Sequence, residues 1–208
     1  ANNTSSGAYS LRYNTTGSNN VAVGHNAIFS NTTGTKNIAV GVDSLYTITA
    51  ARDNVALGFS ALKCNTVNAI TAVGSEAFLA NTTGSKNVGM GYKAGRFNTT
   101  GSNNTVSGYY ALKSNTTGSD NTAFGFRVLC NNTASSNTAV GTNAMFSNTT
   151  GTLNTAVGKN ALYANTSGSC STTIGHYSLS ENTTGAENTA HGYEALKLNT
   201  TGAANSII

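Results

Sequence analysis

The stretch from Asn137 to Leu153, NTAVGTNAMFSNTTGTL, decides the fold, because close copies of it follow one another along the chain. Asn20–Lys36 and Asn154–Cys170 are two further copies, and each copy has one glycine at the same place, the pivot glycine. The step between pivot glycines is constant, except that Gly58 to Gly74 and Gly125 to Gly141 are each shorter by a single position. Such self-similarity at a short period predicts a solenoid, in which each unit buries its apolar face only against its neighbours. The pivot glycines are Gly7, Gly24, Gly41, Gly58, Gly74, Gly91, Gly108, Gly125, Gly141, Gly158, Gly175 and Gly192.

The composition limits the possible classes of protein. Charged residues make up only 9% of the chain, and the net charge of +4 is spread along its whole length. No block of basic residues suited to phosphates occurs, and no basic stretch is interleaved with aromatic residues, so we expect no nucleic-acid partner. No run approaches the roughly 18 apolar residues of a membrane span, so we expect no membrane insertion. The apolar residues recur at fixed positions in every unit, as they do not in disordered polar tracts.

Positions within a unit are counted from the pivot glycine, which is position 0. Asparagine usually stands at −4, a β-branched residue at −3, a small residue at −2 and a larger apolar residue at −1. Short β-branched runs closed by glycine are typical of strands. A second apolar pair at +3 and +4 predicts a further short strand or a single turn, and the closing NTTG predicts a tight corner. We therefore predict an all-β protein, a parallel β-solenoid or β-roll of about twelve 17-residue coils, with one repeat domain over residues 1–208.

Side-chain parity indicates that both faces of each predicted strand are apolar. The residues at −3 and −1 point one way, and the alanine at −2 points the other way. Strands that are apolar on both faces are usually buried on both sides. We expect the bulky face to fill the core of the coil and the alanine face to pack against another chain. The alternative is that a thin coil uses its alanines internally.

The repeat resembles those in the head domains of trimeric autotransporter adhesins. It resembles even more closely the N-T-A-V-G…A-L…N-T-T-G arrays in tail-fibre proteins of phages and large algal viruses. The residues that carry the resemblance are Asn137–Gly141, Ala144 and Asn148–Gly151, with their equivalents in nearly every unit. The resemblance implies a parallel β-roll, three chains side by side, and an adhesive or fibrous role at a surface. It carries over no catalytic or receptor-binding residue.

The residues able to carry out catalysis or bind metal are dispersed along the repeat. His25 and His176 share position +1 but lie nine coils apart, about 43 Å at the spacing of parallel strands. His191 replaces an apolar residue at −1, where a core or seam residue is expected. We therefore expect no catalytic residue, no cofactor and no metal site. The only neighbouring set of acids and a base is Glu181, Glu187, His191 and Glu194.

Three cysteines and two short units lead to structural predictions. Cys64, Cys130 and Cys170 fall on coils at least two apart, farther than the roughly 7 Å between Cα atoms that a disulfide allows, so all three should be free.

The units from Gly58 to Gly74 and from Gly125 to Gly141 each lack one residue. We expect the loss to fall between the corner and the next strand, at 68–72 and 135–139, so that the strands keep their register.

Two kinds of polar residue are candidates for a surface that binds or carries glycans. The NTT triplets match the acceptor pattern for N-glycosylation, although a repeated turn needs the same residues. Stacked threonines such as Thr32 and Thr33 could form ranks that bind ice or polysaccharide. The candidate surface residues are Asn31, Thr32, Asn81, Asn98, Asn115, Asn148, Asn182 and Asn199.

The sequence favours a structural, non-enzymatic rod, which would be a segment of an extracellular fibre, a surface adhesin or a viral tail fibre. The alternative is an ice- or glycan-binding solenoid that uses ranks of threonine and asparagine. The expected partners are further copies of the chain, in a lateral trimer or a head-to-tail filament, and a cell-surface receptor or glycan. The head-to-tail filament is expected because the predicted stack has no polar capping unit at either end.

Overall fold

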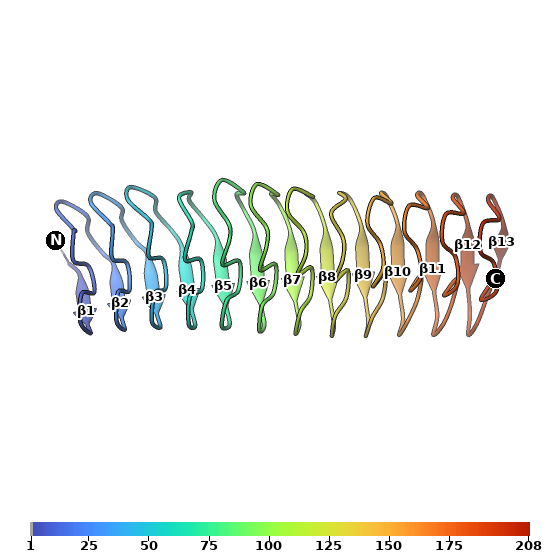
Figure 1. The fold of residues 1–208 in the computed structure, drawn as a ribbon, viewed down its shortest axis with the longest axis horizontal. Coiled ribbons are helices and arrows are strands. Elements are labelled where there is room, and N and C mark those ends of the chain that lie inside the picture. The colour runs from blue at the N-terminus through green and yellow to red at the C-terminus, as the bar shows by residue number, and fades with distance from the viewer. Residues whose placement is uncertain (1) are drawn as a thin grey trace.

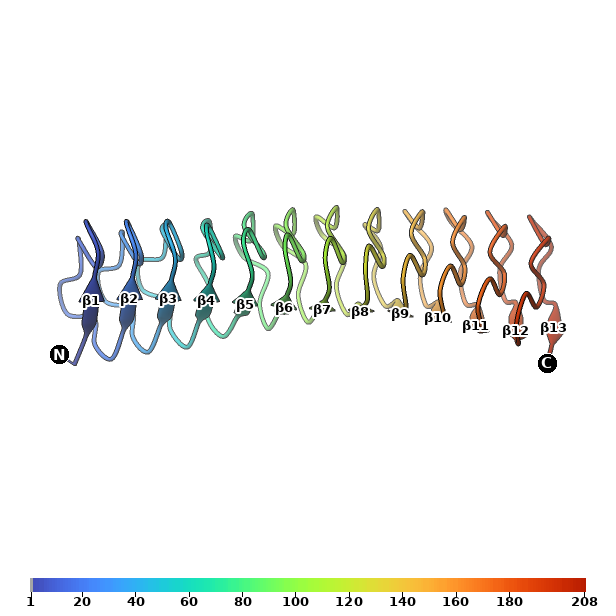
Figure 2. The same ribbon diagram turned by 90° about the horizontal axis from the view of Figure 1, so that it is seen from below.

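The computed structural model describes residues 2–208, and these form an all-β solenoid without helices (Figure 1). Thirteen short strands lie side by side in one parallel sheet, in the order of the sequence. The two ends of the chain lie at opposite ends of this row, which bows gently in the second view (Figure 2). The predicted fold class is confirmed. The strands are β1 (Thr4–Ser6), β2 (Val21–Val23), β3 (Ile38–Val40), β4 (Val55–Leu57), β5 (Thr71–Val73), β6 (Val88–Met90), β7 (Thr105–Ser107), β8 (Thr122–Phe124), β9 (Thr138–Val140), β10 (Thr155–Val157), β11 (Thr172–Ile174), β12 (Thr189–His191) and β13 (Ser206–Ile207).

Each strand pairs with the strand one coil further along the chain. In an ordinary coil the pairing follows the full repeat, as Val21 in β2 pairs with Ile38 in β3. In a short coil the pairing step shrinks with the repeat, as Leu57 in β4 pairs with Val73 in β5, and β8 and β9 pair in the same way. The predicted retention of register is confirmed. Each coil contributes one strand, and the segment at +1 to +6 is a turn rather than a second strand.

The residue missing from each short coil is lost inside the corner. In an ordinary coil the Asn31 amide donates to the carbonyl of Gly34, three residues on, at 3.1 Å. In the short coil the Asn65 amide donates to the carbonyl of Val67, only two residues on, at 2.8 Å, and the second short coil closes likewise. The second threonine of NTTG is therefore the missing residue. The expectation of a loss at 68–72 and 135–139 is wrong, because the corner can close on its asparagine with one residue fewer.

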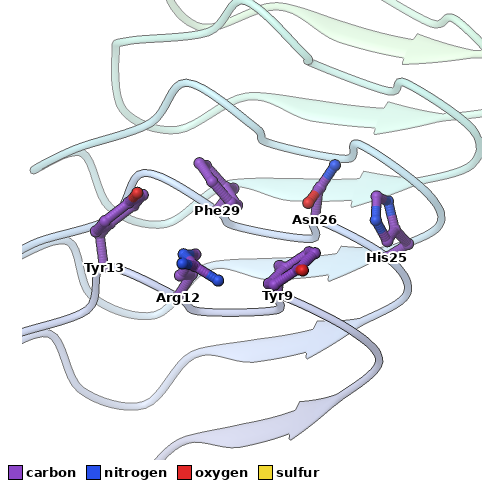
Figure 3. Close-up of a pocket in the computed structure, with 6 residues that line it drawn as sticks. All are labelled: Tyr9, Arg12, Tyr13, His25, Asn26 and Phe29. Carbon is purple, nitrogen blue, oxygen red and sulfur yellow. The ribbon is translucent and has the colours of Figure 1, made fainter.

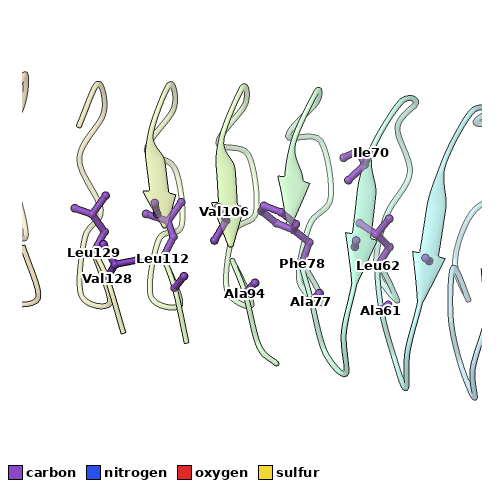
Figure 4. Packing of buried hydrophobic residues seen from close by; sticks show 14 of the residues in the cluster. Ala61, Leu62, Ile70, Ala77, Phe78, Ala94, Val106, Leu112, Val128 and Leu129 are labelled. Carbon is purple, nitrogen blue, oxygen red and sulfur yellow. The ribbon is translucent and has the colours of Figure 1, made fainter. Parts of the chain in front are cut away.

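The core is built from the alanine face of the strands. Ala22 at −2 is fully buried, whereas Val23 at −1 is 37% exposed. The rest of the core comes from +3 and +4, where Ala27 and Ile28 are also fully buried. Figure 4 shows such side chains packed between consecutive coils. The expectation that the bulky face fills the core is wrong and the thin-coil alternative holds, since a leucine-sized residue at +4 leaves room only for methyl groups opposite it.

The pivot glycines allow successive coils to approach closely. At Gly141 the dihedral φ is +127°, and a Cβ atom added there would lie 2.6 Å from the carbonyl oxygen of Gly158. Every pivot glycine from Gly7 to Gly175 meets the backbone of the next coil in this way. A side chain would fit neither the dihedral nor the space. Glycine therefore lets the strand end in a bend while the coils stay one strand spacing apart, about 4.8 Å.

Two ladders of buried asparagines satisfy the polar groups of the turns. At −4, the Asn37 N–H donates to Oδ1 of Asn20 at 2.9 Å, and Nδ2 of Asn20 donates to the carbonyl of Gly34 at 2.8 Å. In the corner, Nδ2 of Asn31 donates to Oδ1 of Asn14 at 2.7 Å. An amide both donates and accepts, so identical asparagines can bond one another in a row. Their burial is thereby compensated by hydrogen bonds.

One coil departs from the usual core, and its neighbour compensates. Phe78 stands at +4, where most coils have leucine, and is fully buried (Figure 4). The next coil has Gly89 in place of alanine at −2 and Gly95 in place of leucine at +4. A Cβ atom added at Gly89 would lie 2.5 Å from Cε2 of Phe78. The core volume is therefore balanced across adjacent coils and not within each coil.

We expect Gly141→Ala to destabilise the solenoid more than Gly192→Ala. Both glycines have nearly the same φ, +127° and +126°, so both variants incur backbone strain of about 1–3 kcal/mol. At Gly141 the new methyl group would also meet the carbonyl of Gly158, whereas at Gly192 the nearest described atom is Cβ of Ala195, 3.9 Å away. Chemical denaturation of both variants measures the difference. Equal losses would show that the dihedral alone requires glycine.

We expect Gly89→Ala and Phe78→Leu to be coupled. Phe78→Leu leaves a cavity and should cost about 1 kcal/mol or more, and Gly89→Ala alone should cost a similar amount through overpacking. In the double variant the alanine fills the space that the ring vacates, so its loss of unfolding free energy should be clearly smaller than the two losses added. Denaturant unfolding of the four proteins completes the cycle. Additive losses would contradict the volume balance.

Candidate functional site

The residues considered for catalysis or metal binding lie at different positions of their coils. His191 is in strand β12, and Glu181, Glu187 and Glu194 occupy three other positions. Within residues 2–208 no group of three or more histidine, cysteine, aspartate or glutamate side chains is arranged to hold a metal ion. The same residues include no helix long and apolar enough to cross a bilayer.

All three cysteines are free thiols, as predicted. Cys130 is buried, and burial raises the pKa of its thiol above the ordinary value. Cys170 is exposed, and Cys64 is half-buried. Since the thiolate is the reactive form, Cys130 is the least suited of the three to act as a nucleophile.

The candidate surface asparagines lie inside the coil. Asn148 is typical: its Nδ2 donates to the carbonyl of Gly151 at 2.9 Å and to Oδ1 of Asn132 at 2.6 Å. A glycan on this nitrogen would replace one of the two hydrogens that form these bonds, and the fully buried side chain leaves no room for a sugar. The expectation that these asparagines face a binding partner or carry glycans therefore does not fit their position in the ladder. Fully buried are Asn31, Asn81, Asn98, Asn115, Asn148 and Asn182, and Asn199 is half-buried.

The corner threonines use their hydroxyl groups within the solenoid. Oγ1 of Thr32, which is half-buried, donates to the carbonyl of Thr49 on the next coil at 3.2 Å, and Oγ1 of Thr149 donates to Thr166 at 2.9 Å. The second threonine of the corner, such as Thr33, is exposed. The short coils lack this second residue, so its rank is interrupted. The corner therefore presents a less regular row of hydroxyl groups to a ligand than a repeated NTTG would predict.

The outer sheet face consists of the residues at −3 and −1 of strands β1–β13. Many of its large side chains are exposed, including Val40 at 39%, Met90 at 47% and Ile174 at 44%. Thirteen strands at a spacing of about 4.8 Å give a strip about 60 Å long. The apolar side chains run mainly along position −1, and threonine is the commonest residue at −3, so the strip combines an apolar column with a largely hydroxyl-bearing one.

A second outer face, the aromatic–basic face, is formed by positions +1, +2, +5 and +6. It holds eight of the eleven basic residues and four of the seven acidic ones, so it carries the whole net charge of +4. It also holds fourteen of the sixteen phenylalanine and tyrosine residues. Figure 3 shows a shallow hollow at its N-terminal end, where the guanidinium of Arg12 lies 4.6 Å from the ring centre of Tyr9. The hollow is lined by Tyr9, Arg12, Tyr13, His25, Asn26 and Phe29.

Some basic side chains of this face are neutralised by carboxylates. Nζ of Lys63 lies 3.0 Å from Oδ2 of Asp43. Burial acts to raise the pKa of Asp43, but hydrogen bonds from Asn26 and Lys63 and the charge of Lys63 outweigh it and hold the pKa below its usual value. Glu76 forms ion pairs with Arg96 and Lys93. The remaining basic side chains of the face set its electrostatic character.

No known family model matches this sequence, and no curated protein or solved structure is significantly similar to it. The fold and the two outer faces are therefore the features that indicate the function of this chain.

The aromatic–basic face is the feature that reading along the chain misses. Within one coil its members form only short pairs, such as Tyr92–Lys93 and Arg96–Phe97, so no single stretch of the sequence indicates an extended charged surface. The extended face forms across coils, as Tyr109 lies beside Tyr92 and Phe126. Aligning the units on their pivot glycines and counting charge by position would have found the face.

Proposed function

We propose that the chain is a structural, non-enzymatic rod, a segment of an extracellular fibre, a surface adhesin or a viral tail fibre. The observation that supports this role is the outer sheet face, which runs the length of the rod with exposed apolar side chains. Contact of this strip with water is unfavourable, and packing rods side by side would bury it. A role as a lateral building unit accounts for both the stiffness of the fold and the chemistry of this face.

The outer sheet face takes the place of the alanine face as the surface for lateral association. The columns at −3 and −1 are separated by one residue and form a strip only about 7 Å wide. Over the length of the rod this strip has a projected area on the order of 400 Å². Three such strips can meet around one axis, which is the arrangement implied by the resemblance to trimeric adhesin heads. These lateral contacts around a threefold axis close after three chains and give a discrete trimer.

A second candidate function is suggested by threonines on the outer sheet face. From β7 to β12 the residue at −3 is always threonine, and register pairing places each beside the next, as Thr138 pairs with Thr155. A regular rank of hydroxyl groups on a flat sheet could bind ice or a glycan. The neighbouring position −1 is irregular, since it includes Phe124 and His191. The two candidate functions compete for one face. The rank is Thr105, Thr122, Thr138, Thr155, Thr172 and Thr189.

We expect the chain to associate laterally and the double variant Val40→Glu, Val140→Glu to abolish this association. Both valines are exposed on the outer sheet face, at 39% and 37%, and buried carboxylates in an apolar interface would be strongly unfavourable. Sedimentation velocity of the wild-type chain and the variant measures the mass of the species. Electron microscopy distinguishes a compact bundle from a longer filament.

The matched control is the double variant Val42→Glu, Leu153→Glu. These residues are also exposed, at 41% and 61%, but lie outside the sheet. The control adds the same charge and should associate as the wild type does. A wild-type chain that stays monomeric at high concentration, or equal effects of both variants, would contradict lateral association through the sheet.

We expect the chain to leave the growth of ice crystals unchanged, because its outer sheet face serves association between chains. An ice-recrystallisation assay with the wild-type chain, Thr155→Lys and Thr142→Lys measures this. Thr155 belongs to the threonine rank, whereas Thr142 is exposed at position +1. Inhibition of crystal growth that Thr155→Lys removes and Thr142→Lys retains would favour the second candidate function.

A further inference from the structure

The middle of the aromatic–basic face presents a stack of rings whose flat faces are covered. Tyr109 lies between Tyr92 and Phe126, with ring centres 5.1 Å and 5.5 Å away and planes inclined by 26° and 14°. The rings therefore stack along the solenoid axis, one per coil. Their edges and the tyrosine hydroxyls remain available to a partner. The edge of an aromatic ring carries partial positive charge, so it favours an anion.

Cations without carboxylate partners lie beside this stack. Nζ of Lys113 is 4.7 Å from the ring centre of Tyr110, and the guanidinium of Arg127 is 4.6 Å from that of Phe146. Among residues 2–208 no carboxylate lies within 4.0 Å of either cation. The rings hold these long side chains in place without neutralising them. Their charge is available to an external anion.

The tyrosine hydroxyls add neutral hydrogen-bond donors to the same region. A hydrogen bond with Tyr110 raises the pKa of Tyr109 above the ordinary value. This direction of shift identifies the O–H of Tyr109 as the donor of that hydrogen bond, so the hydroxyl of Tyr110 is the one left to donate to a partner. Around it, Lys93 and Arg96 share Glu76, the only acidic residue of the aromatic–basic face between Asp43 and Glu181.

We propose that the section of the aromatic–basic face from Tyr92 to Phe146 binds an acidic polysaccharide laid along the solenoid axis. The cations, tyrosine hydroxyls and ring edges would contact the sulfate or carboxylate groups of the polymer. A linear glycan carries such groups along its chain, and this section offers basic side chains on three successive coils, with Lys93 and Arg96 on the first, Lys113 on the second and Arg127 on the third. Charge-assisted hydrogen bonds from arginine and lysine are the strong contacts of such a complex.

The geometry favours a polysaccharide over single-stranded nucleic acid. Proteins that bind single strands stack the bases on exposed ring faces. Here each face of Tyr109 is covered by a neighbouring ring, and the ring of Tyr110 is covered by Lys113. A polymer that needs only edge contacts to charged groups loses nothing through this covering.

This inference goes beyond the proposed structural role and does not depend on it. The aromatic–basic face and the outer sheet face use different positions of each coil, so a chain that fails to associate laterally should still bind the polyanion. Conversely, a chain that associates but binds no polyanion would refute only the present proposal.

The experiment measures binding of the full chain to immobilised heparin, polygalacturonate, dextran and an oligothymidylate strand. We expect binding to heparin and polygalacturonate that weakens as salt rises, and little binding to neutral dextran. The double variant Lys113→Gln, Arg127→Gln should weaken heparin binding about tenfold, since it removes two charge contacts made by half-buried side chains of the face. The matched control Lys36→Gln, Lys86→Gln removes the same charge from exposed residues outside the face and should change binding less than twofold.

Three outcomes would overturn the proposal. Equal weakening by the two double variants would show that net charge alone attracts the polymer. Oligothymidylate bound as tightly as heparin, with the same loss in Lys113→Gln, Arg127→Gln, would assign the face to nucleic acid. Absence of heparin and polygalacturonate binding at low salt, with unchanged thermal unfolding of every variant, would show that the face binds no acidic polysaccharide.

Discussion

The close approach of neighbouring coils at the pivot glycine is the constraint on which the rest of this structure depends. The carbonyl of Gly158 occupies the space where a side chain on Gly141 would have to lie, and the same contact recurs along the stack. Only bare backbone lets a bend repeat at the spacing of parallel strands. Every position of the coil is thereby stacked on its own equivalent, and each residue type must tolerate a copy of itself as neighbour.

This requirement decides which residues can repeat. Asparagine suits a repeated buried position because its amide both donates and accepts, as between Asn31 and Asn14. Where Ile48 interrupts the corner ladder, Oδ1 of Asn31 is left without a hydrogen-bond partner. Charged residues form no such ladder along the whole stack, because like charges at one position of adjacent coils repel; Arg96 and Lys113 are consecutive at +5, and Arg96 has Glu76 as its partner. Aromatic rings can, since Phe29 and Tyr46 stack with their planes inclined by only 4°.

The sequence alone predicts the parts of the fold that follow from this repetition. It does not predict features that depend on the thickness of the coil or on a particular contact between side chain and backbone. The glycine period predicts the solenoid and the strand register. It does not reveal which apolar face is inside, because both faces of a strand such as Val21–Val23 are apolar and only the thin coil selects Ala22. Nor does it place the residue missing before Val67, since that depends on which carbonyl the amide of Asn65 reaches. The prediction that the corner asparagines form a binding surface is wrong for the same reason. Asparagines that repeat at one position give the same sequence pattern whether their side chains are buried or exposed.

Comparison of the units within this one chain separates structure from function. The pivot glycine, the asparagines and the core alanines hardly change between coils, because each supports contacts that every coil needs. Positions +1, +2 and +5 change freely, from His25 to Tyr92 to Lys159 at +1 alone. The outer sheet face contains no lysine or arginine, whereas the aromatic–basic face holds eight of the eleven basic residues. This segregation gives the rod two chemically different sides, one suited to apolar surface and one suited to a polar, charged partner.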